Sequence, residues 1–235
     1  MSVSQTFLAI LFVTTCLISI NLAGQDGRAR KIDEYGRLFT DDESARLDTF
    51  YLALHNQPDL KGYIVGYNDP PGLRGQFLRR IYGDWRYLTK YRGLDPNRII
   101  VLNGGYREKF TIELWVVPPE ATPPKPAPTL PQWSGSPSGA YKFDEECIVC
   151  EPAVNLDLYA LDAGISFFAD ALHEDMNSRG EIIIQPDKGM NAHEAKDMAE
   201  RARGLLVDKY HIEFSRIGTR IGRKGTGEAE FWVRR

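Results

Sequence analysis

The sequence predicts an α+β fold in which two tandem copies of one small βαβαββ unit are joined by a proline-rich linker. The chain has 235 residues, of which 43% are hydrophobic and 26% charged, and this is enough for two small domains. Eight of its 14 prolines fall between Pro118 and Pro137, and the segments on either side share motifs. We therefore expect a first module over residues 31–118, a linker over 119–140 that holds the modules apart, and a second module over 141–235.

The two halves repeat the same short motifs at nearly constant spacing. GYIV in the first half matches GEII in the second, LDPNRI with Arg98 matches IEFSRI with Arg216, and TIELWVV with Trp115 matches EAEFWVR with Trp232. The two arginines lie 118 positions apart and the two tryptophans 117. A repeat of this length indicates one structural unit that occurs twice.

The first helix of each module is predicted by hydrophobic residues that recur with helical spacing. These residues are Leu47, Phe50, Tyr51 and Leu54 in the first half, and Leu161, Ile165, Phe168 and Leu172 in the second. Thr40 and Glu43 stand in capping-box spacing before the first of these helices. Each helix leads into a short apolar strand, Tyr63–Tyr67 or Glu181–Gln185.

A second helix and two strands complete each unit. The second helix has a stripe of large residues in the first half and of smaller ones in the second: Leu73, Phe77, Ile81, Trp85 and Leu88 against Ala195, Ala199, Ala202 and Leu206. In the first half, strands are predicted at Arg98–Leu102 and at Phe110–Val117, where apolar residues occupy alternate positions. This order of elements implies that the helices cover one face of each sheet.

The N-terminus is predicted to be a secretory signal peptide over residues 1–24. Phe7 to Leu22 is an almost unbroken apolar run, and the small residues Ala23 and Gly24 follow it. The run is shorter than the roughly 20 residues that a helix needs to span a bilayer core. We expect an exported protein, attached to a membrane only if the signal remains uncleaved as an anchor.

The overall charge and the distribution of polar residues argue against two broad classes of function. A formal net charge of −3 and a pI near 5.9 offer no surplus of basic residues for a phosphate backbone, so nucleic acid is not an expected partner. No Ser-His-Asp or paired-carboxylate constellation repeats or clusters by spacing. We therefore expect a binding protein rather than an enzyme, and no cofactor.

Cys147 and Cys150 allow three interpretations: a redox CxxC motif, half of a zinc site, or a local disulfide. No second CxxC exists, and His173, His193 and His211 lie at irregular spacings, so no metal site is predicted. A redox CxxC motif sits at a helix N-terminus, which lowers the thiol pKa, whereas the acidic neighbours here would raise it. In an exported chain we favour a disulfide, with a thiol-disulfide redox protein as the alternative.

The segment Arg79–Ile99, RRIYGDWRYLTKYRGLDPNRI, is similar to the second helix and following strand of the OmpA-like C-terminal domain, a peptidoglycan-binding module of bacterial envelopes. Arg80 lies seven residues before Tyr87, where the family has its arginine. Asp69, in the loop GYNDPPG, lies near the aspartate of the family's GxTDxxG motif. The resemblance covers both halves, more clearly the first, and implies two tandem OmpA-like modules.

The resemblance implies that Asp69 and Arg80 bind peptidoglycan non-covalently. In the family these residues hold the diaminopimelate of the peptide stem, since a zwitterionic centre needs a carboxylate for its ammonium and a guanidinium for its carboxylate. Taken singly, Asp69 could instead cap a turn and Arg80 could be solvated. Met198 stands at the position of Arg80 in the second half, so that half is expected to have lost this ligand. The expected location is the periplasm or the exterior of a bacterial cell, with peptidoglycan or an envelope protein as partner, or a purely structural scaffold as the alternative.

Overall fold

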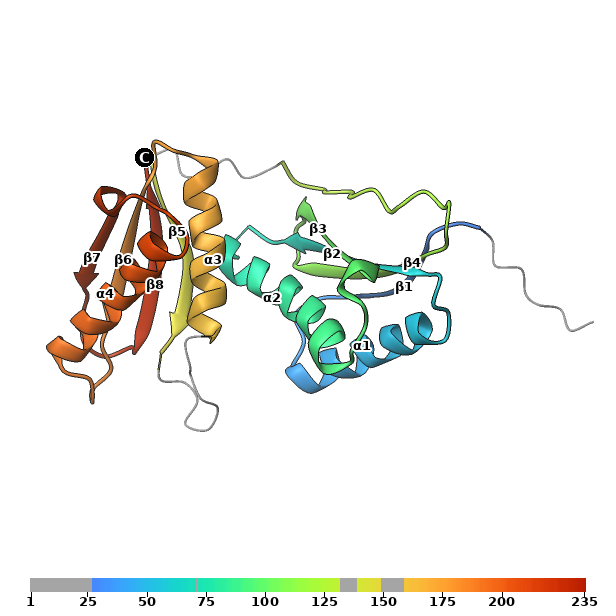
Figure 1. The fold of residues 1–235 in the computed structure, drawn as a ribbon, viewed down its shortest axis with the longest axis horizontal. Helices are drawn as coiled ribbons and strands as arrows, with labels where there is room; N and C mark the ends of the chain where they lie inside the picture. Colours follow the sequence, from blue (N-terminus) through green and yellow to red (C-terminus); the bar gives the residue numbers. More distant parts are fainter. Residues whose placement is uncertain (1–26, 71, 132–138, 149–158) are drawn as a thin grey trace, which may run out of the picture.

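The computed structural model describes residues 27–70, 72–131, 139–148 and 159–235 (Figure 1). The predicted signal peptide and Cys150 lie outside these ranges. Within them, no helix combines the length and the apolar character needed to cross a membrane.

The first half forms a four-stranded mixed sheet with two helices. Its elements are β1 (Arg30–Tyr35), α1 (Thr40–His55), β2 (Lys61–Asn68), α2 (Arg74–Arg86), β3 (Ile99–Tyr106) and β4 (Thr111–Val117). The strand order is β1-β4-β2-β3, in which β2 and β3 are parallel and the other pairs antiparallel. A π-helical turn, Tyr87–Tyr91, extends α2, and a 3₁₀ turn, Pro96–Arg98, precedes β3.

The second half repeats this arrangement. Its elements are β5 (Ala140–Cys147), α3 (Tyr159–Glu174), β6 (Arg179–Gln185), α4 (Ala192–Asp208), β7 (Ile217–Ile221) and β8 (Glu228–Arg234), with a 3₁₀ turn, Phe214–Arg216, before β7. The strand order β5-β8-β6-β7 and the strand directions match those of the first sheet. The predicted α+β class, with two mixed sheets and four helices, is confirmed.

The two sheets agree in residue register as well as in strand order. Gly62 pairs with Ile99 in the first sheet, and Gly180 pairs with Ile217 in the second. Against the last strand of their module, β1 and β5 shift register at the same point, before Asp33 and Asp144 respectively. The sequence repeat therefore corresponds to a repeat of the backbone.

In each module an arginine donates hydrogen bonds to carbonyls at and just after the end of the first helix; Arg216 is buried and Arg98 is partly buried. Arg98 donates hydrogen bonds to the carbonyls of Leu54, Gln57 and Leu60, and Arg216 to those of Leu172, Asp175 and Ser178. The last carbonyls of a helix have no partner within the helix, and each arginine binds one of them, that of Leu54 or Leu172, together with two carbonyls of the loop that follows. The shared LDPNRI and IEFSRI motifs are thus explained by one structural role.

The N-terminus of α1 differs from the prediction. The residue before the helix is Phe39, which makes no capping hydrogen bond with its side chain, and Thr40 is already the first helical residue. The carboxylate of Glu43 binds Arg80 instead of the helix N-terminus. The predicted capping box is therefore wrong, because a tertiary ion pair takes the carboxylate that the local motif would use.

Each module has its own hydrophobic core between its helices and its sheet. In the first core, Phe77 and Ile81 of α2 pack over the sheet, whereas α4 brings Ala195 and Ala199 to the equivalent place in the second. Leu78 of α2 is partly buried and packs against both cores. The two modules are therefore in contact through α2.

The proline-rich segment packs on the first module instead of standing free. Figure 1 shows its described part, up to residue 131, running past the side of the first sheet that faces away from α1 and α2. The amide of Ala127 donates to Tyr67 Oη at 3.1 Å, Arg107 Nε donates to the carbonyl of Ala127 at 3.2 Å, and the amide of Leu130 donates to the carbonyl of Tyr106. The expectation that this segment holds the modules apart is wrong, because the first module binds its backbone at Ala127 and Leu130 and the two modules are in contact through α2.

Candidate functional site

Asp69 and Arg80 lie on either side of the loop that joins β1 to α1. Asp69 follows β2, and its Oδ1 accepts a hydrogen bond from Arg37 Nη2 at 2.6 Å. Arg80 is in the second turn of α2, and its Nη2 donates to the carbonyl of Leu38 at 2.9 Å. The site therefore lies where β1 and β2 end and the helices begin, an edge at which α/β sheets commonly bind ligands.

A tight turn fixes the backbone at Asp69. The amide of Gly72 donates to the carbonyl of Asp69 at 2.8 Å, and Asn68 Nδ2 donates to the carbonyl of Gly72 at 3.1 Å. A Cβ atom at position 72 would lie 2.4 Å from Asn68 Oδ1 and 2.6 Å from Asp69 Oδ1, so any larger residue there would displace these two side chains. Asn68 is buried, and its hydrogen bond to Gly72 anchors the loop to the end of β2.

Arg80 is held by an ion pair with Glu43. Its Nε donates to Glu43 Oε1 at 2.8 Å, and the carboxylate is far less exposed than the guanidinium. Behind this pair, Asp84 is buried and its Oδ2 accepts a hydrogen bond from Tyr35 Oη at 3.3 Å. Arg80 therefore lies beside two buried carboxyl groups and forms an ion pair with one of them, Glu43.

Burial dominates the electrostatics of this cluster. Desolvation raises the pKa of Asp84 well above its usual range, and the nearby Glu43 adds to the rise. Desolvation also raises the pKa of Glu43, while the positive charge of Arg80 acts in the opposite direction. Because a buried carboxylate is costly without full compensation, one positive charge does not hold both acids ionised over their ordinary pH range.

Sequence reasoning identified Asp69 and Arg80 but not the residues that pair with them. Neither single-residue alternative describes the outcome, since both side chains make tertiary ion pairs, Asp69 with Arg37 and Arg80 with Glu43. The signal for Arg37 was its place directly after the first strand. Glu43 lies in the first turn of α1, where an acidic side chain can reach a neighbouring helix. The capping-box pattern predicted instead that its carboxylate would bind the N-terminus of its own helix.

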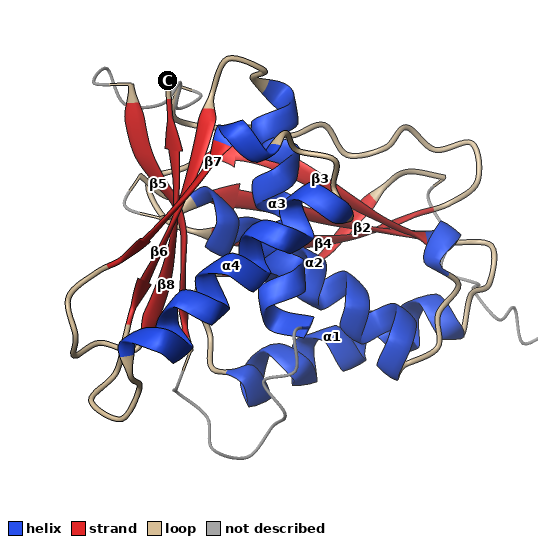
Figure 2. Ribbon diagram, turned by 60° about the vertical axis from the view of Figure 1, so that its left-hand side comes forward, coloured by secondary structure: helices blue, strands red, loops and turns tan. Residues whose placement is uncertain are grey.

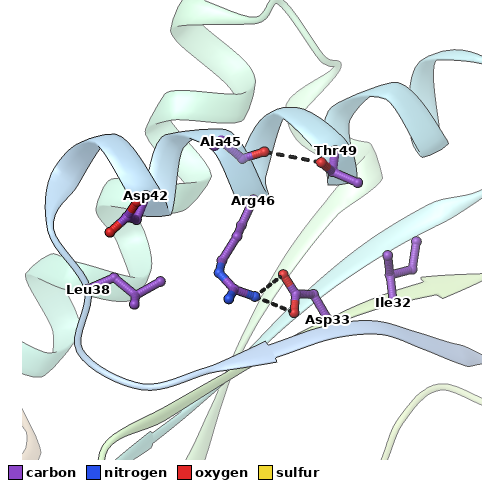
Figure 3. Close-up of a pocket in the computed structure, with 7 residues that line it drawn as sticks. All are labelled: Ile32, Asp33, Leu38, Asp42, Ala45, Arg46 and Thr49. Carbon is purple, nitrogen blue, oxygen red and sulfur yellow. Dashed lines mark hydrogen bonds and ion pairs between the residues drawn. The ribbon is translucent and has the colours of Figure 1, made fainter.

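An open pocket adjoins the site and shares Leu38 with it. Its volume is about 550 Å³, and it is lined by Ile32, Asp33, Leu38, Asp42, Ala45, Arg46 and Thr49 (Figure 3). Arg46 reaches from α1 towards β1, where its Nη1 donates to both carboxylate oxygens of Asp33 at 2.7 and 2.8 Å. The ion pair of Arg46 and Asp33 therefore gives the pocket a polar part in its lining.

The second module lacks the same set of charges. Asp187 occupies the loop after β6, where its carboxylate accepts hydrogen bonds from the amides of Gly189 at 3.1 Å and Met190 at 2.7 Å. It therefore acts as a turn cap. Met198, at the position of Arg80, is partly buried and packs against the second core.

Cys147 ends the edge strand β5 and is disulfide-bonded. Cys150, its predicted partner, lies outside the described residues, so the pairing stays a prediction. Cys147 is not at a helix N-terminus, where a redox CxxC motif would have a lowered thiol pKa. In the described ranges, no group of three or more His, Cys, Asp and Glu side chains is placed to hold a metal ion.

No protein-family model matches the chain, and no curated protein matches it either. The observations that bear on function are therefore the duplicated fold, the loop that carries Asp69, and the ion pairs that Asp69 and Arg80 make.

Proposed function

We propose that this is an exported protein of the bacterial cell envelope whose first module, an OmpA-like unit, binds peptidoglycan non-covalently through Asp69 and Arg80. The main support is the pair of opposite charges beside one loop, each of which already has a counter-ion of the kind that a zwitterionic ligand would offer. Arg37 provides a cation to Asp69, and Glu43 provides a carboxylate to Arg80.

The two ends of the site differ in how readily they would accept a ligand. The Arg37 side chain is 57% exposed, and an exposed ion pair contributes little to stability, so a ligand ammonium can replace it at low cost. Arg80 donates through Nε and Nη2 to partners within the chain. A guanidinium has five N–H donors, so a ligand carboxylate can bind the remaining ones while Glu43 stays in place.

The envelope location follows from the predicted signal peptide and from the disulfide at Cys147, which suits a compartment outside the cytosol. The redox alternative has less support, because Cys147 ends a strand and the buried Glu146 precedes it. No described contact favours catalysis by this cysteine over a structural disulfide.

The proposal is tested by co-sedimentation of the signal-free protein with purified peptidoglycan. Asp69→Asn removes a charge and keeps the side-chain shape, and Arg80→Gln removes a charge and shortens the side chain. Each is expected to weaken binding about tenfold or more, since a hydrogen bond to a charged group contributes about 1.5–3 kcal/mol. Free diaminopimelate should compete for binding.

The matched control is Asp187→Asn, which changes the equivalent loop of the second module and should leave retention unchanged. Arg37→Gln should tighten binding slightly, because it removes the internal competitor at Asp69. Retention that is indifferent to both Asp69→Asn and Arg80→Gln would reject this site, and no retention of the unchanged protein would reject the function.

A further inference from the structure

Helix α2 of the first module docks on the second module through a buried charge cluster. Figures 1 and 2 both show α2 beside α3. Arg79 of α2 donates to both carboxylate oxygens of Asp144 on β5, at 2.7 and 3.0 Å, and its Nη1 lies 2.7 Å from Glu146 Oε1. Gly75 permits this approach, because a Cβ atom there would lie 2.4 Å from Asp144 Cγ.

Two further contacts surround this cluster. Arg74 forms a bidentate ion pair with Glu174 at the end of α3, at 2.6 and 2.8 Å, and the rings of Tyr82 and Phe167 lie 5.1 Å apart. The interface therefore combines an exposed ion pair, an aromatic contact and the buried cluster. In the ion pair one positive charge faces one negative charge, whereas in the buried cluster the acidic groups outnumber the basic ones.

One guanidinium faces two buried carboxyl groups at this interface. Asp144 is 0% exposed and accepts well-directed hydrogen bonds. Glu146 is also buried, and its Oε1, although close to Nη1, is the one buried side-chain oxygen in the described parts of the chain without a hydrogen bond of good geometry. With both acids ionised, the interface would bury a net negative charge, and this is costly.

No second cation faces Glu146 among the described residues. Helix α2 presents Arg79, and β5 itself presents Asp144. Helix α3 presents Gly164, whose added Cβ would lie 2.9 Å from Glu146 Oε1, and β8 pairs Ala229 with Glu146. Desolvation raises the pKa of Glu146 to about 7, with Asp144 adding to the rise and Arg79 opposing it.

We propose that docking of the two modules is linked to proton uptake by Glu146, so that the modules hold together in acid and separate more readily as the pH rises through neutrality. In separated modules Glu146 would contact water, and its pKa would fall towards its ordinary value of 4.5. Below that pH the acid is neutral in both states, and docking is strongest. Between the ordinary value and about 7 only the docked state holds the proton, so docking weakens with rising pH, and above about 7 it reaches a constant lower level.

The size of this effect is bounded by the change in pKa. If the whole change came from docking, the docking equilibrium would fall at most roughly 300-fold from acid to alkaline pH. Part of the burial comes from α3 and β8 of the same module, so a smaller change is expected. The inference does not depend on peptidoglycan binding, since it concerns Arg79 and not the ligand residues.

The experiment measures the distance between the modules as a function of pH. Fluorescent dyes at Leu52→Cys and His193→Cys report on the first and second module, at positions exposed in the structure, with the native disulfide intact. The docked fraction should fall between pH 5 and 8. Glu146→Gln, which imitates the neutral acid, should keep the modules docked at pH 8 and remove the pH dependence.

Glu174→Gln is the matched control, because it removes an acid from the same interface without touching the buried cluster. It should weaken docking by a similar factor at every pH and bring both states into the measurable range, while keeping the pH dependence. A docked fraction that is constant from pH 5 to 8 in both the unchanged protein and Glu174→Gln would overturn the proposal. An unchanged pH dependence in Glu146→Gln would do the same.

Discussion

The groove between the first strand and the first helix is built differently in the two modules. In the first module, Arg46 of α1 binds Asp33 on β1, within the same unit. In the second, the position 118 residues after Arg46 is Gly164, and the strand aspartate, Asp144, is bound by Arg79 of the other module. Both aspartates stand at the register shift of their strand.

This difference explains why one groove is open and the other is an interface. In the first module the arginine supplied by α1 satisfies the aspartate, and the groove stays a solvent-accessible pocket (Figure 3). In the second module the glycine leaves room for a helix from outside and leaves the aspartate without a local cation. The residue at this position of the first helix, Arg46 or Gly164, thus differs between a module that supplies the cation for its own strand aspartate and one whose aspartate is bound by the other module.

The largest effect is expected from Gly164→Arg, which gives the second module the groove of the first. The new side chain can reach Asp144 as Arg46 reaches Asp33, and even its Cβ would lie 2.9 Å from Glu146 Oε1. Arg79 should be displaced, and the docked fraction should fall more than tenfold at pH 6 while each module stays folded. Small-angle scattering and the inter-module distance measure this.

Gly204→Arg is the control for Gly164→Arg, because it adds the same side chain to a helix of the same module at an open position. It should leave docking unchanged. If Gly164→Arg left the modules docked as before, the residue at this position would not explain why one groove is open and the other is an interface.

A smaller effect, on stability, is expected from removing the arginines that close the first helices. Arg216 is 8% exposed, so Arg216→Ala should remove its hydrogen bonds to the carbonyls of the buried Leu172 and Ser178 and lower the free energy of unfolding of the second module by roughly 2–3 kcal/mol. Arg98 is partly exposed, and Arg98→Ala should cost the first module about 1–2 kcal/mol, since water can replace part of its contacts.

Urea denaturation followed separately in each module measures these two losses. Arg220→Ala, which breaks an exposed ion pair with Glu181, should change stability by less than about 0.5 kcal/mol. Equal losses for Arg98→Ala and Arg216→Ala would mean that burial does not distinguish the two sites.

Local patterns in the sequence predicted the elements of the fold well. The helical stripes placed Phe50, Leu54 and Ile81 in one core and Phe168 in the other, as the structure has them. These predictions succeeded because hydrophobic periodicity is recorded within a few residues of chain. The repeat added the equivalence of the two halves, which the strand orders match.

Contacts between distant segments were not predictable in the same way. Arg79 and Asp144 are separated by 65 positions, and neither lies in a pattern that points to the other. Composition identified the proline-rich segment as a spacer, but Tyr67 and Arg107, which bind its backbone, lie in separate strands or turns of the first module. At the candidate site, Asp69 and Arg80 came from a family resemblance, whereas their partners depend on how the β1–α1 loop folds back.

Apart from the control Arg220→Ala, the smallest effect on stability is expected from Arg46→Ala, which removes the arginine that the first module supplies to its own groove. The Arg46 and Asp33 side chains are 41% and 26% exposed, so water can solvate Asp33 when its partner is lost. The free energy of unfolding of the first module should fall by about 0.5–1 kcal/mol, and docking of the modules should not change.

Arg79→Ala is the counterpart in the second groove, and there the modules should separate, because Asp144 can regain solvation only when α2 leaves. Thermal unfolding and the inter-module distance, measured on both variants, therefore distinguish an arginine that water can replace from one that water cannot. A loss above about 2 kcal/mol in Arg46→Ala would show that the first groove also depends on its arginine. The difference between the open pocket and the interface would then have to be explained by the shape of the helices, and not by how well water can solvate the strand aspartate.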